Sequence, residues 1–308
     1  MIPVFWKELA DHFGRRRFVI LIGLILFASM WAGFVAVRSL PDLAGEVPPD
    51  LVFLQLFTGG SGVIPPFLFF LSFFGPLIGI TLGFDAINSE RSQGTLSRVL
   101  SQPIYRDALF NGKFLAGLTT ITVVQVSIVV IVVGIGMFIL GFGPTLDFSL
   151  RIAIFTIASI IYMAFWLAIA MLCSVWFNQA VSSAMTSLAL WIFFGFIMLM
   201  VAGALADALV SDPQPTEELV ERVRVERMAR RFSPVTLFQE ATVTILTPTV
   251  RSLGPALVQE GSRLERLRPL PLNQSLNLIW PHLVAILALA AICFGISYAR
   301  FLREEIRS

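Results

Sequence analysis

Long apolar segments alternate with short polar segments along most of this chain of 308 residues. A helix needs about 20 predominantly apolar residues to cross the hydrocarbon core of a bilayer. Six segments have about this length and contain no Asp, Glu, Lys or Arg: Phe18–Val37, Val63–Phe84, Phe114–Gly143, Ile152–Phe177, Ala180–Ala206 and Pro281–Ala299. The pattern therefore predicts an all-α integral membrane protein with six transmembrane helices.

The composition supports the same class. Hydrophobic residues make up 56% of the chain and charged residues only 14%, with a mean hydropathy of +0.83. A soluble domain carries about 25% charged residues, so a soluble core does not account for this chain. The first apolar segment is longer than the 7–15 residues or so of a signal-peptide core. We therefore expect it to be retained as the first span.

Lys and Arg residues predict the orientation, because short cytoplasmic loops carry an excess of them. With the N-terminus inside, the cytoplasmic parts hold eleven of these residues and the short outer loops only two, Arg38 and Arg151. Both termini are then expected in the cytoplasm. The organisation follows as residues 1–17, a surface helix; 18–206, spans one to five; 207–280, an outer loop; and 281–308, span six with a cytoplasmic tail.

The first 17 residues have the spacing of an amphipathic helix. Ile2, Phe5, Trp6, Leu9 and Phe13 share one face, while the polar face holds Lys7, Glu8, Asp11 and His12. Such a helix, followed by a basic run, is expected to lie flat on the inner leaflet. The residues predicted to contact the membrane surface are Phe5, Trp6, Leu9, Phe13, Arg15, Arg16 and Arg17. A disordered basic terminus is the alternative, and His12 is expected only to occupy the polar face.

The polar segment between the second and third spans, residues 83–113, has an internal order that suggests a contact surface. Thr95 after Gly94 is a plausible N-cap, and Pro103 ends the short apolar stripe that follows. We expect a short helix over about residues 94–101, lying along the membrane, with Arg91 and Arg98 toward the cytosol. A second helix is expected to start near Ile104 and to continue into the third span.

The outer loop contains two further helix patterns. Residues 216–232 carry Glu and Arg at a favourable spacing of four, and Ser233-Pro234 is typical of a helix start. We expect these helices to form a small cap over the outer face of the membrane. A purely structural cap and a cap that gates a substrate are equally compatible with the sequence.

Several kinds of chemistry have no support in the sequence. The chain has no G-x-x-x-x-G-K-[ST] phosphate loop and no H-E-x-x-H motif, and its spans lack the charged residues that mark ion pathways. Cys173 and Cys293 lie in apolar segments and have no metal-ligand spacing. Gly59-Gly60-Ser61-Gly62 fits the G-x-S-G motif of rhomboid-like intramembrane proteases, with His282 as a possible base. A flexible loop is the favoured interpretation, because a serine nucleophile needs a base within hydrogen-bond reach.

The residues of the inner loop carry a family resemblance. The pattern runs from Phe84-Asp85 through Ser89-Glu90-Arg91 and Gly94-Thr95-Leu96, then Leu100-Ser101-x-Pro103-x-x-Arg106 and Gly112-Lys113. It resembles the ABC-2 type transporter permease family, and especially permeases similar to that of the nitrous-oxide-reductase maturation system. The resemblance covers nearly the whole chain, although the long outer loop departs from members with short outer loops.

The resemblance implies a role and a set of partners. Permeases of this kind pair as homo- or heterodimers in a prokaryotic inner membrane and dock two ATP-binding subunits, which hold the ATP and Mg. The short helix between spans two and three is then the coupling helix, and the N-terminal helix resembles the family's connecting helix. The resemblance implies coupling roles for Glu90, Arg91, Gly94, Thr95, Leu96 and Arg106, with Arg98 on the cytosolic edge of the same helix. Ordinary interfacial caps and anchors are the alternative for each residue.

The sequence therefore favours a non-enzymatic permease subunit of an ATP-driven exporter, without a cofactor, a metal or a nucleic-acid partner of its own. Two alternatives stay open. The chain could transmit mechanical force in an ABC complex without transporting a substrate, or, much less plausibly, it could be an intramembrane serine protease. The sequence does not identify the substrate.

Overall fold

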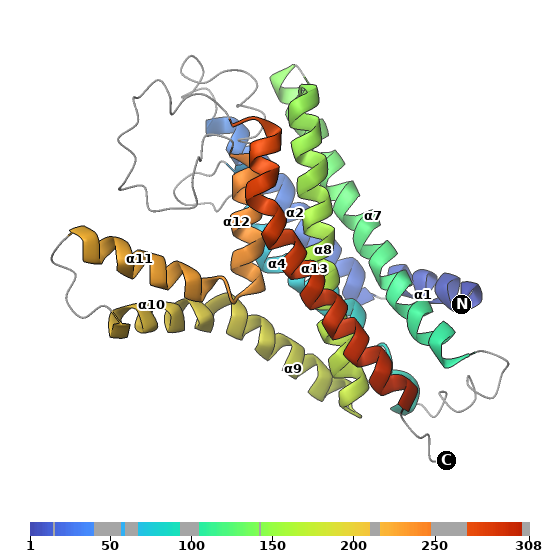
Figure 1. Cartoon of the computed structure of the whole chain (residues 1–308). Helices are drawn as coiled ribbons and strands as arrows, with labels where there is room; N and C mark the ends of the chain where they lie inside the picture. Colours follow the sequence, from blue (N-terminus) through green and yellow to red (C-terminus); the bar gives the residue numbers. More distant parts are fainter. Residues whose placement is uncertain are drawn as a thin grey trace.

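The computed structural model describes residues 1–14, 16–39, 57–58, 67–92, 105–141, 143–209, 216–247 and 270–303, and every regular element among them is helical. On the N-terminal side these are α1 (Ile2–Gly14), α2 (Arg16–Ser39), α4 (Phe67–Gly83), α5 (Asn88–Ser92), α7 (Arg106–Leu140) and α8 (Leu146–Trp176). Then follow α9 (Ala180–Ile192), the π-helical turn η2 (Phe193–Ile197), α10 (Met198–Leu209), α11 (Thr216–Arg230), α12 (Pro234–Leu246) and α13 (Leu272–Arg303). Figure 1 shows their arrangement.

Five helical stretches among the described residues are long and apolar enough to cross a membrane. They are Phe67–Ser92, Arg106–Phe138, Leu146–Trp176, Ala180–Leu209 and Leu272–Arg303. Each one overlaps an expected span, so the all-helical, multi-pass class is confirmed. The remaining expected span, Phe18–Val37, falls within α2, whose 24 residues extend about 36 Å at the usual rise of a helix. The count of six spans stays a prediction.

Two helix boundaries show how local sequence determines the ends of the spans. The helix expected near Ile104 begins at Arg106 and runs unbroken into the third span, as predicted. It ends at Gly141, which adopts the left-handed conformation with φ of 75° that glycine accepts without steric cost. The sixth span was expected to begin at Pro281, but α13 begins nine residues earlier, at Leu272. The proline lies inside the helix, where it removes one backbone hydrogen bond without ending it.

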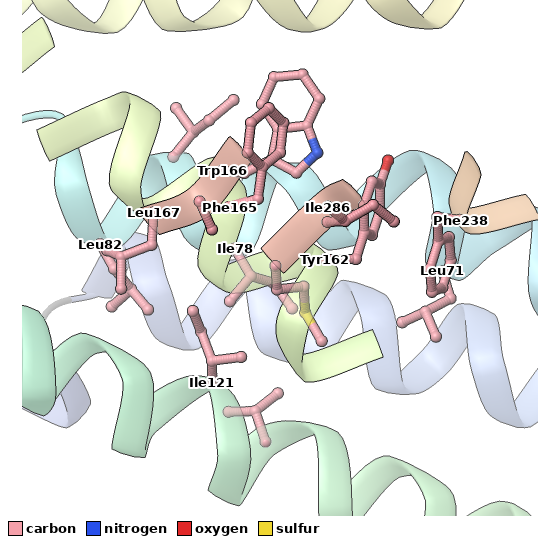
Figure 2. Close-up of a cluster of buried hydrophobic side chains, with 14 of the residues drawn as sticks. Leu71, Ile78, Leu82, Ile121, Tyr162, Phe165, Trp166, Leu167, Phe238 and Ile286 are labelled. Carbon is pink, nitrogen blue, oxygen red and sulfur yellow. The ribbon is translucent and has the colours of Figure 1, made fainter. Parts of the chain in front are cut away.

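Helix α8 lies at the centre of the bundle and packs against α4, α7, α9, α12 and α13. Its middle carries Tyr162 and Trp166, both fully buried, and Figure 2 shows them among core side chains of the neighbouring helices, including Ile78, Ile121 and Ile286. The ring of Tyr162 stacks on Phe238 of α12 at a centroid distance of 4.2 Å. The core is therefore built around one helix that touches nearly every other part of the bundle.

Two glycines bring α4 and α8 into backbone contact. A β-carbon added at Gly79 would lie 2.5 Å from the carbonyl oxygen of Met163, and one added at Gly83 would lie 2.8 Å from that of Leu167. Small residues at this spacing let membrane helices approach closely. Helix α4 leads directly to the polar segment of the inner loop, so its end is held firmly on α8.

Helix α9 turns back from α8 after a short connection at residues 177–179. Unlike α8, the helical stretch Ala180–Leu209 buries little of its surface within the chain. A π-helical turn at Phe193–Ile197 divides α9 from α10, and α11 returns beside α10 (Figure 1). The helix predicted over residues 216–232 is thus confirmed as α11.

Helix α12 begins at Pro234, with the Ser233 side chain accepting a hydrogen bond from the backbone N–H of Val235, so the predicted N-cap is confirmed. Its position differs from the expected cap. Phe238 stacks on Tyr162, which lies at the middle of α8, and the helix packs along α8, α13 and α4 (Figure 1). The apolar residues Phe238, Ala241 and Ile245 are buried there. Because burying this stripe is favourable, α12 belongs to the bundle and does not lie above it.

Candidate functional site: the junction around Lys113

Three of the expected coupling residues are described, and they lie at the two ends of the inner loop. Glu90 and Arg91 belong to α5, and Arg106 is the first residue of α7. Gly94, Thr95, Leu96 and Arg98, and with them the helix expected over residues 94–101, lie outside the described residues. The structure therefore shows how the loop is attached at its two ends.

Lys113 joins the two ends of this loop to the N-terminal helix. Its ammonium nitrogen lies 2.7 Å from Oε1 of Glu8 in α1 and 2.9 Å from Oε1 of Glu90 in α5. Lys113 and Glu8 are almost completely buried, and Glu90 is largely so. One cation thus holds together α1, the residues before the loop and the helix that follows it. We call Glu8, Glu90 and Lys113 the inner ion cluster.

The inner ion cluster holds more negative than positive charge, because two carboxylates share one buried ammonium. Lys7, whose side chain is 63% exposed, lies 3.5 Å from Glu8 and 3.9 Å from Glu90 and supplies a second, weaker cation. Removing one partner of a buried ion pair is much more costly than removing an exposed partner, because a charge is left without compensation. Lys113 is therefore the residue on which the cluster depends.

The pKa of Glu8 follows from its surroundings. Burial alone would raise the pKa of this carboxyl group, but the charge of Lys113 and its hydrogen bond lower it, with smaller contributions from Lys7 and His12. The net result is a pKa below the ordinary value. Glu8 is consequently ionised at neutral pH and attracts Lys113 as a full charge.

Helix α1 is oriented opposite to what its polar face suggests. The polar residues Glu8 and His12 are buried against α7, whereas Trp6 and Phe13 of the apolar face are exposed. His12 lies 3.2 Å from the hydroxyl of Thr120, so the expectation that it merely occupies the polar face is wrong. The sequence pattern identified the two faces of the helix, but not that polar groups of α7 would bind the polar one.

The remaining residues predicted for the membrane-surface helix have mixed positions. Phe5 and Leu9 are half-buried at the edge of the same face, and Arg16 is exposed at the start of α2. Arg15 and the side chain of Arg17 lie outside what the structure describes. Because Trp6 and Phe13 are exposed, they are free to touch the membrane surface, and this contact stays a prediction.

Close packing supports the contact between α1 and α7. A β-carbon on Gly112 would lie 3.0 Å from Val4, so glycine allows α1 to approach the first turns of α7. The sequence pattern included Gly112 and Lys113 but gave them no role. Their role was not recognisable because the partner, Glu8, lies 105 residues away along the chain.

Hydrogen bonds fasten the other side of α5 to α8 and the turn that follows it. The hydroxyl of Ser174 accepts hydrogen bonds from the backbone N–H groups of Ile87 and Asn88, at 2.9 and 3.2 Å. Arg91 donates to the side-chain oxygen of Asn178 at 2.7 Å. The residues before the loop are thus attached to α7 through charges and to α8 through hydrogen bonds.

A second charged cluster lies between α12 and α13. Oε2 of Glu240 is 2.8 Å from Nε of Arg231 and 3.0 Å from Nε2 of His282. In the part of the chain that the structure describes, His282 has this acidic partner and no serine at hydrogen-bond distance. Ser61, the proposed protease nucleophile, lies outside the described residues. We call Arg231, Glu240 and His282 the outer ion cluster.

Arg151 of α8 forms a further set of contacts, at the end of α12 and before the start of α13. Its guanidinium is buried, pairs with Asp147 at 2.8 Å, and donates to the carbonyl oxygens of Ile245 and Leu270 at 3.1 and 2.6 Å. The sequence predicted only that Arg151 lies in a short outer loop and assigned it no contact. In the structure it connects α8 to the end of α12 and to Leu270, two residues before α13.

Two neighbouring cavities follow the side of α12 that faces α4. Their volumes are about 130 and 350 Å³, and both are lined by Phe69, Ser72 and Gln239. Trp191 and Phe196 complete the wall of the smaller one. Hydroxyl, amide, aromatic and aliphatic groups line both cavities, and no charged side chain of the described residues does, which agrees with the scarcity of charge in the spans.

Among the described residues, no three His, Cys, Asp or Glu side chains are placed to hold a metal ion. Cys173 and Cys293 are both described, and both are free thiols. The two ion clusters and their hydrogen bonds attach helices to one another.

Comparison with known proteins agrees with this architecture. Residues 2–306 match the family described as ABC-2 family transporter protein, and the chain belongs to this family. It is a multi-pass membrane protein of the permease class. Among individual proteins it is similar to the probable ABC transporter permease protein NosY of Pseudomonas aeruginosa strain PAO1. The two are 29% identical over 203 residues, which cover 63% of this chain and 67% of the relative.

Proposed function

We propose that this chain is the membrane-spanning subunit of an ATP-driven exporter and that a separate subunit binds and hydrolyses ATP. The family and the NosY-like relative support a permease subunit. The lack of a phosphate loop anywhere in the sequence supports a partner that supplies the nucleotide site. In this proposal the chain spans the membrane six times with both termini in the cytoplasm of a prokaryotic cell.

The observation that carries the proposal is the attachment of the inner loop. Lys113 connects both ends of the segment at residues 93–104 to α1, and Ser174 and Asn178 connect its first end to α8. A partner that moved this segment would move α4, α7 and α1 together. The segment around Gly94–Ser101, with Thr95, Leu96 and Arg98, is the proposed contact with the ATP-binding subunit.

The proposed mechanism needs two arrangements of the complex. Two permease copies dock two ATP-binding subunits, and binding of ATP and Mg to those subunits favours one arrangement over the other. A ligand shifts such an equilibrium only by its difference in affinity for the two states. The inner ion cluster transmits this difference because its charges are too costly to separate during the movement.

The uncharged cavities beside α12 bear on the kind of substrate. Ser72, Thr236 and Gln239 offer hydrogen bonds beside aromatic side chains, without a charge that would select an ion. We propose an uncharged or amphiphilic substrate in preference to a free ion. The second candidate function is a subunit that only transmits force, which needs no substrate site.

The test uses the full chain reconstituted with its ATP-binding subunit in liposomes. We expect the double variant Glu90→Gln and Arg91→Gln to keep the complex assembled but to lose the dependence of ATP hydrolysis on the permease. The matched control is Glu221→Gln with Arg224→Gln, an exposed ion pair of α11. Unchanged ATP hydrolysis and transport in the Glu90 and Arg91 variant would contradict the coupling role.

Two further results would decide between the alternatives. ATP-dependent conformational change without movement of any substrate would support the force-transmitting subunit. Labelling of the wild-type chain by a serine-directed probe, lost in Ser61→Ala, would support the protease. We expect no such labelling, because the described surroundings of His282 provide an acidic partner but no serine.

A further inference from the structure

A third cavity lies where α8 and α13 end. Its volume is about 530 Å³, and Trp176, Ile296, Ala299, Arg300 and Arg303 line it. The guanidinium carbon of Arg300 lies 4.3 Å from the ring centroid of Trp176. This contact holds the guanidinium of Arg300 at the cavity wall, because a guanidinium is attracted to the face of an indole ring.

The charge of this cavity is unbalanced among the described residues. Arg151, Arg222 and Arg231 each pair with a carboxylate, whereas no described acidic side chain pairs with Arg300 or Arg303. The next two residues, Glu304 and Glu305, lie outside the described residues. The described wall therefore presents two cations toward one space, which suits an anionic ligand.

The apolar part of the wall indicates what kind of anion fits. Ile292 and Ile296 are both exposed on α13. They precede Arg300 at intervals of four residues, so the three side chains follow one another along the same side of the helix. Trp176 is about half exposed at the end of α8, and tryptophan is enriched where a span meets the membrane surface. Two arginines and an exposed apolar strip are thus joined at one end of a membrane-spanning helix.

We propose that this cavity binds an anionic phospholipid of the adjacent leaflet. The phosphate group lies between Arg300 and Arg303, and an acyl chain lies along Ile296 and Ile292. Basic sites at the ends of membrane helices recognise anionic lipid headgroups in this way. The inference rests on the membrane-spanning part of the proposed function and is independent of ATP coupling and of the direction of transport.

The test measures lipid binding to the full chain in detergent, without an ATP-binding subunit, by native mass spectrometry. The probes are phosphatidylglycerol and phosphatidylcholine with identical acyl chains. With about 1 kcal/mol from each of two arginines, we expect an advantage of about thirtyfold for phosphatidylglycerol. The double variant Arg300→Gln and Arg303→Gln should reduce this advantage to a few-fold at most.

The control removes two arginines elsewhere. Arg224→Gln with Arg227→Gln changes the net charge equally on α11 and should keep the full preference. If the glutamine variant does not fold, Arg300→Lys with Arg303→Lys keeps the charge and should keep most of the preference. Trp176→Leu should weaken it by several-fold, because the platform for Arg300 is lost while both charges remain.

Three outcomes would overturn the proposal. One is an equal preference in the wild type and in the Arg300 and Arg303 glutamine variant. Another is displacement of the lipid by millimolar inorganic phosphate or glycerol phosphate, which would assign the site to a soluble anion. The third is loss of lipid binding on dimerisation, which would show that a second copy of the chain covers the cavity. Failure of ATP coupling would leave all these results unaffected, so the two proposals can fail separately.

Discussion

Helices α1 and α12 have 13 residues each and similar amphipathic patterns, but they bury opposite faces. In α12 the apolar residues Phe238 and Ile245 are completely buried. In α1 the apolar residues Trp6 and Phe13 are exposed, while Glu8 and His12 are buried. Each helix is nevertheless bound to a long helix by a polar side-chain contact, α1 through the ion pair of Glu8 with Lys113 and α12 through the contact of Glu240 with His282.

The difference follows from what each helix has as a neighbour. Helix α12 lies among α4, α8 and α13, where protein side chains cover its apolar stripe. Helix α1 lies beside the beginning of α7, and although Phe13 touches Phe18 of α2, both Trp6 and Phe13 stay exposed, so lipid can cover this side. An amphipathic pattern predicts that one face meets an apolar phase, and that phase can be either protein or membrane.

Lys113→Met should have the largest effect, because it leaves the carboxylates of Glu8 and Glu90 buried without their cation. We expect a loss of about 5 kcal/mol in the free energy of unfolding. The measurement is unfolding of the full chain by SDS titration in mixed micelles. Lys7→Met, at an exposed position of the same cluster, should cost less than about 1 kcal/mol. Equal losses for the two variants would show that α1 is not held by a buried charge.

The apolar faces of the two helices should respond differently to truncation. Phe238→Ala removes a buried ring that stacks on Tyr162 and should cost about 3 kcal/mol. Phe13→Ala removes an exposed ring and should cost less than about 1 kcal/mol in the same titration. The Phe13 variant should instead bind less well to the membrane surface, measured as weaker quenching of Trp6 by brominated lipids. A large loss of stability for Phe13→Ala would place protein, and not lipid, over α1.

Acid should weaken the attachment of α1 through Glu8. Because the pKa of Glu8 is lowered in the folded chain, its stabilising effect is present above the unfolded value of 4.5 and is lost as the pH falls through the folded value. Glu8→Gln should cost about 2 kcal/mol at pH 7, within the range for a hydrogen bond to a charged group. The measurement is the difference in Tm between this variant and the wild type from pH 7 to pH 3. A difference that stays constant over this range would contradict the ionised Glu8.

Ser233→Ala tests the beginning of α12 and should have the smallest effect. The serine caps the helix and also donates a hydrogen bond to the carbonyl oxygen of Phe194 at 2.7 Å. Loss of a cap costs about 1 kcal/mol. Ser233→Asp keeps the cap but lacks the hydroxyl donor, so the difference between the two variants separates the cap from the bond to Phe194. No loss in either variant would show that packing alone positions α12.

Features that depend on neighbouring residues were predictable from the sequence. The apolar segments located five of the spans, and Ser233-Pro234 marked the beginning of α12. Each of these features is determined by backbone geometry or by burial within a few residues. For the same reason the inner loop was recognised as a distinct segment.

Features that depend on distant partners were not predictable in the same way. Glu8 and Lys113 are 105 residues apart, and Ser174 and Ile87 are 87 residues apart. Many charged and hydroxyl side chains have similar local surroundings, and only the packing of the helices selects the pairs. Glu90 and Arg91 were proposed from the family resemblance, and the structure adds the residues to which they are attached. The contact with an ATP-binding subunit stays a prediction.

The π-helical turn at Phe193–Ile197 has a consequence for the phase of the helix that follows it. A π-turn holds its residues with i→i+5 hydrogen bonds and so accommodates more of them than an α-turn. Each residue of an α-helix advances the side chains by about 100° around the axis. Because the π-turn already holds an extra residue, deleting Gly195 would let it close to regular α-helical bonding and leave Ala202 and Ala206, the buried residues of α10, facing nearly the same direction. An α-helical stretch holds no such extra residue, so deleting one residue between the π-turn and Ala202 would rotate both alanines by about 100° relative to α9.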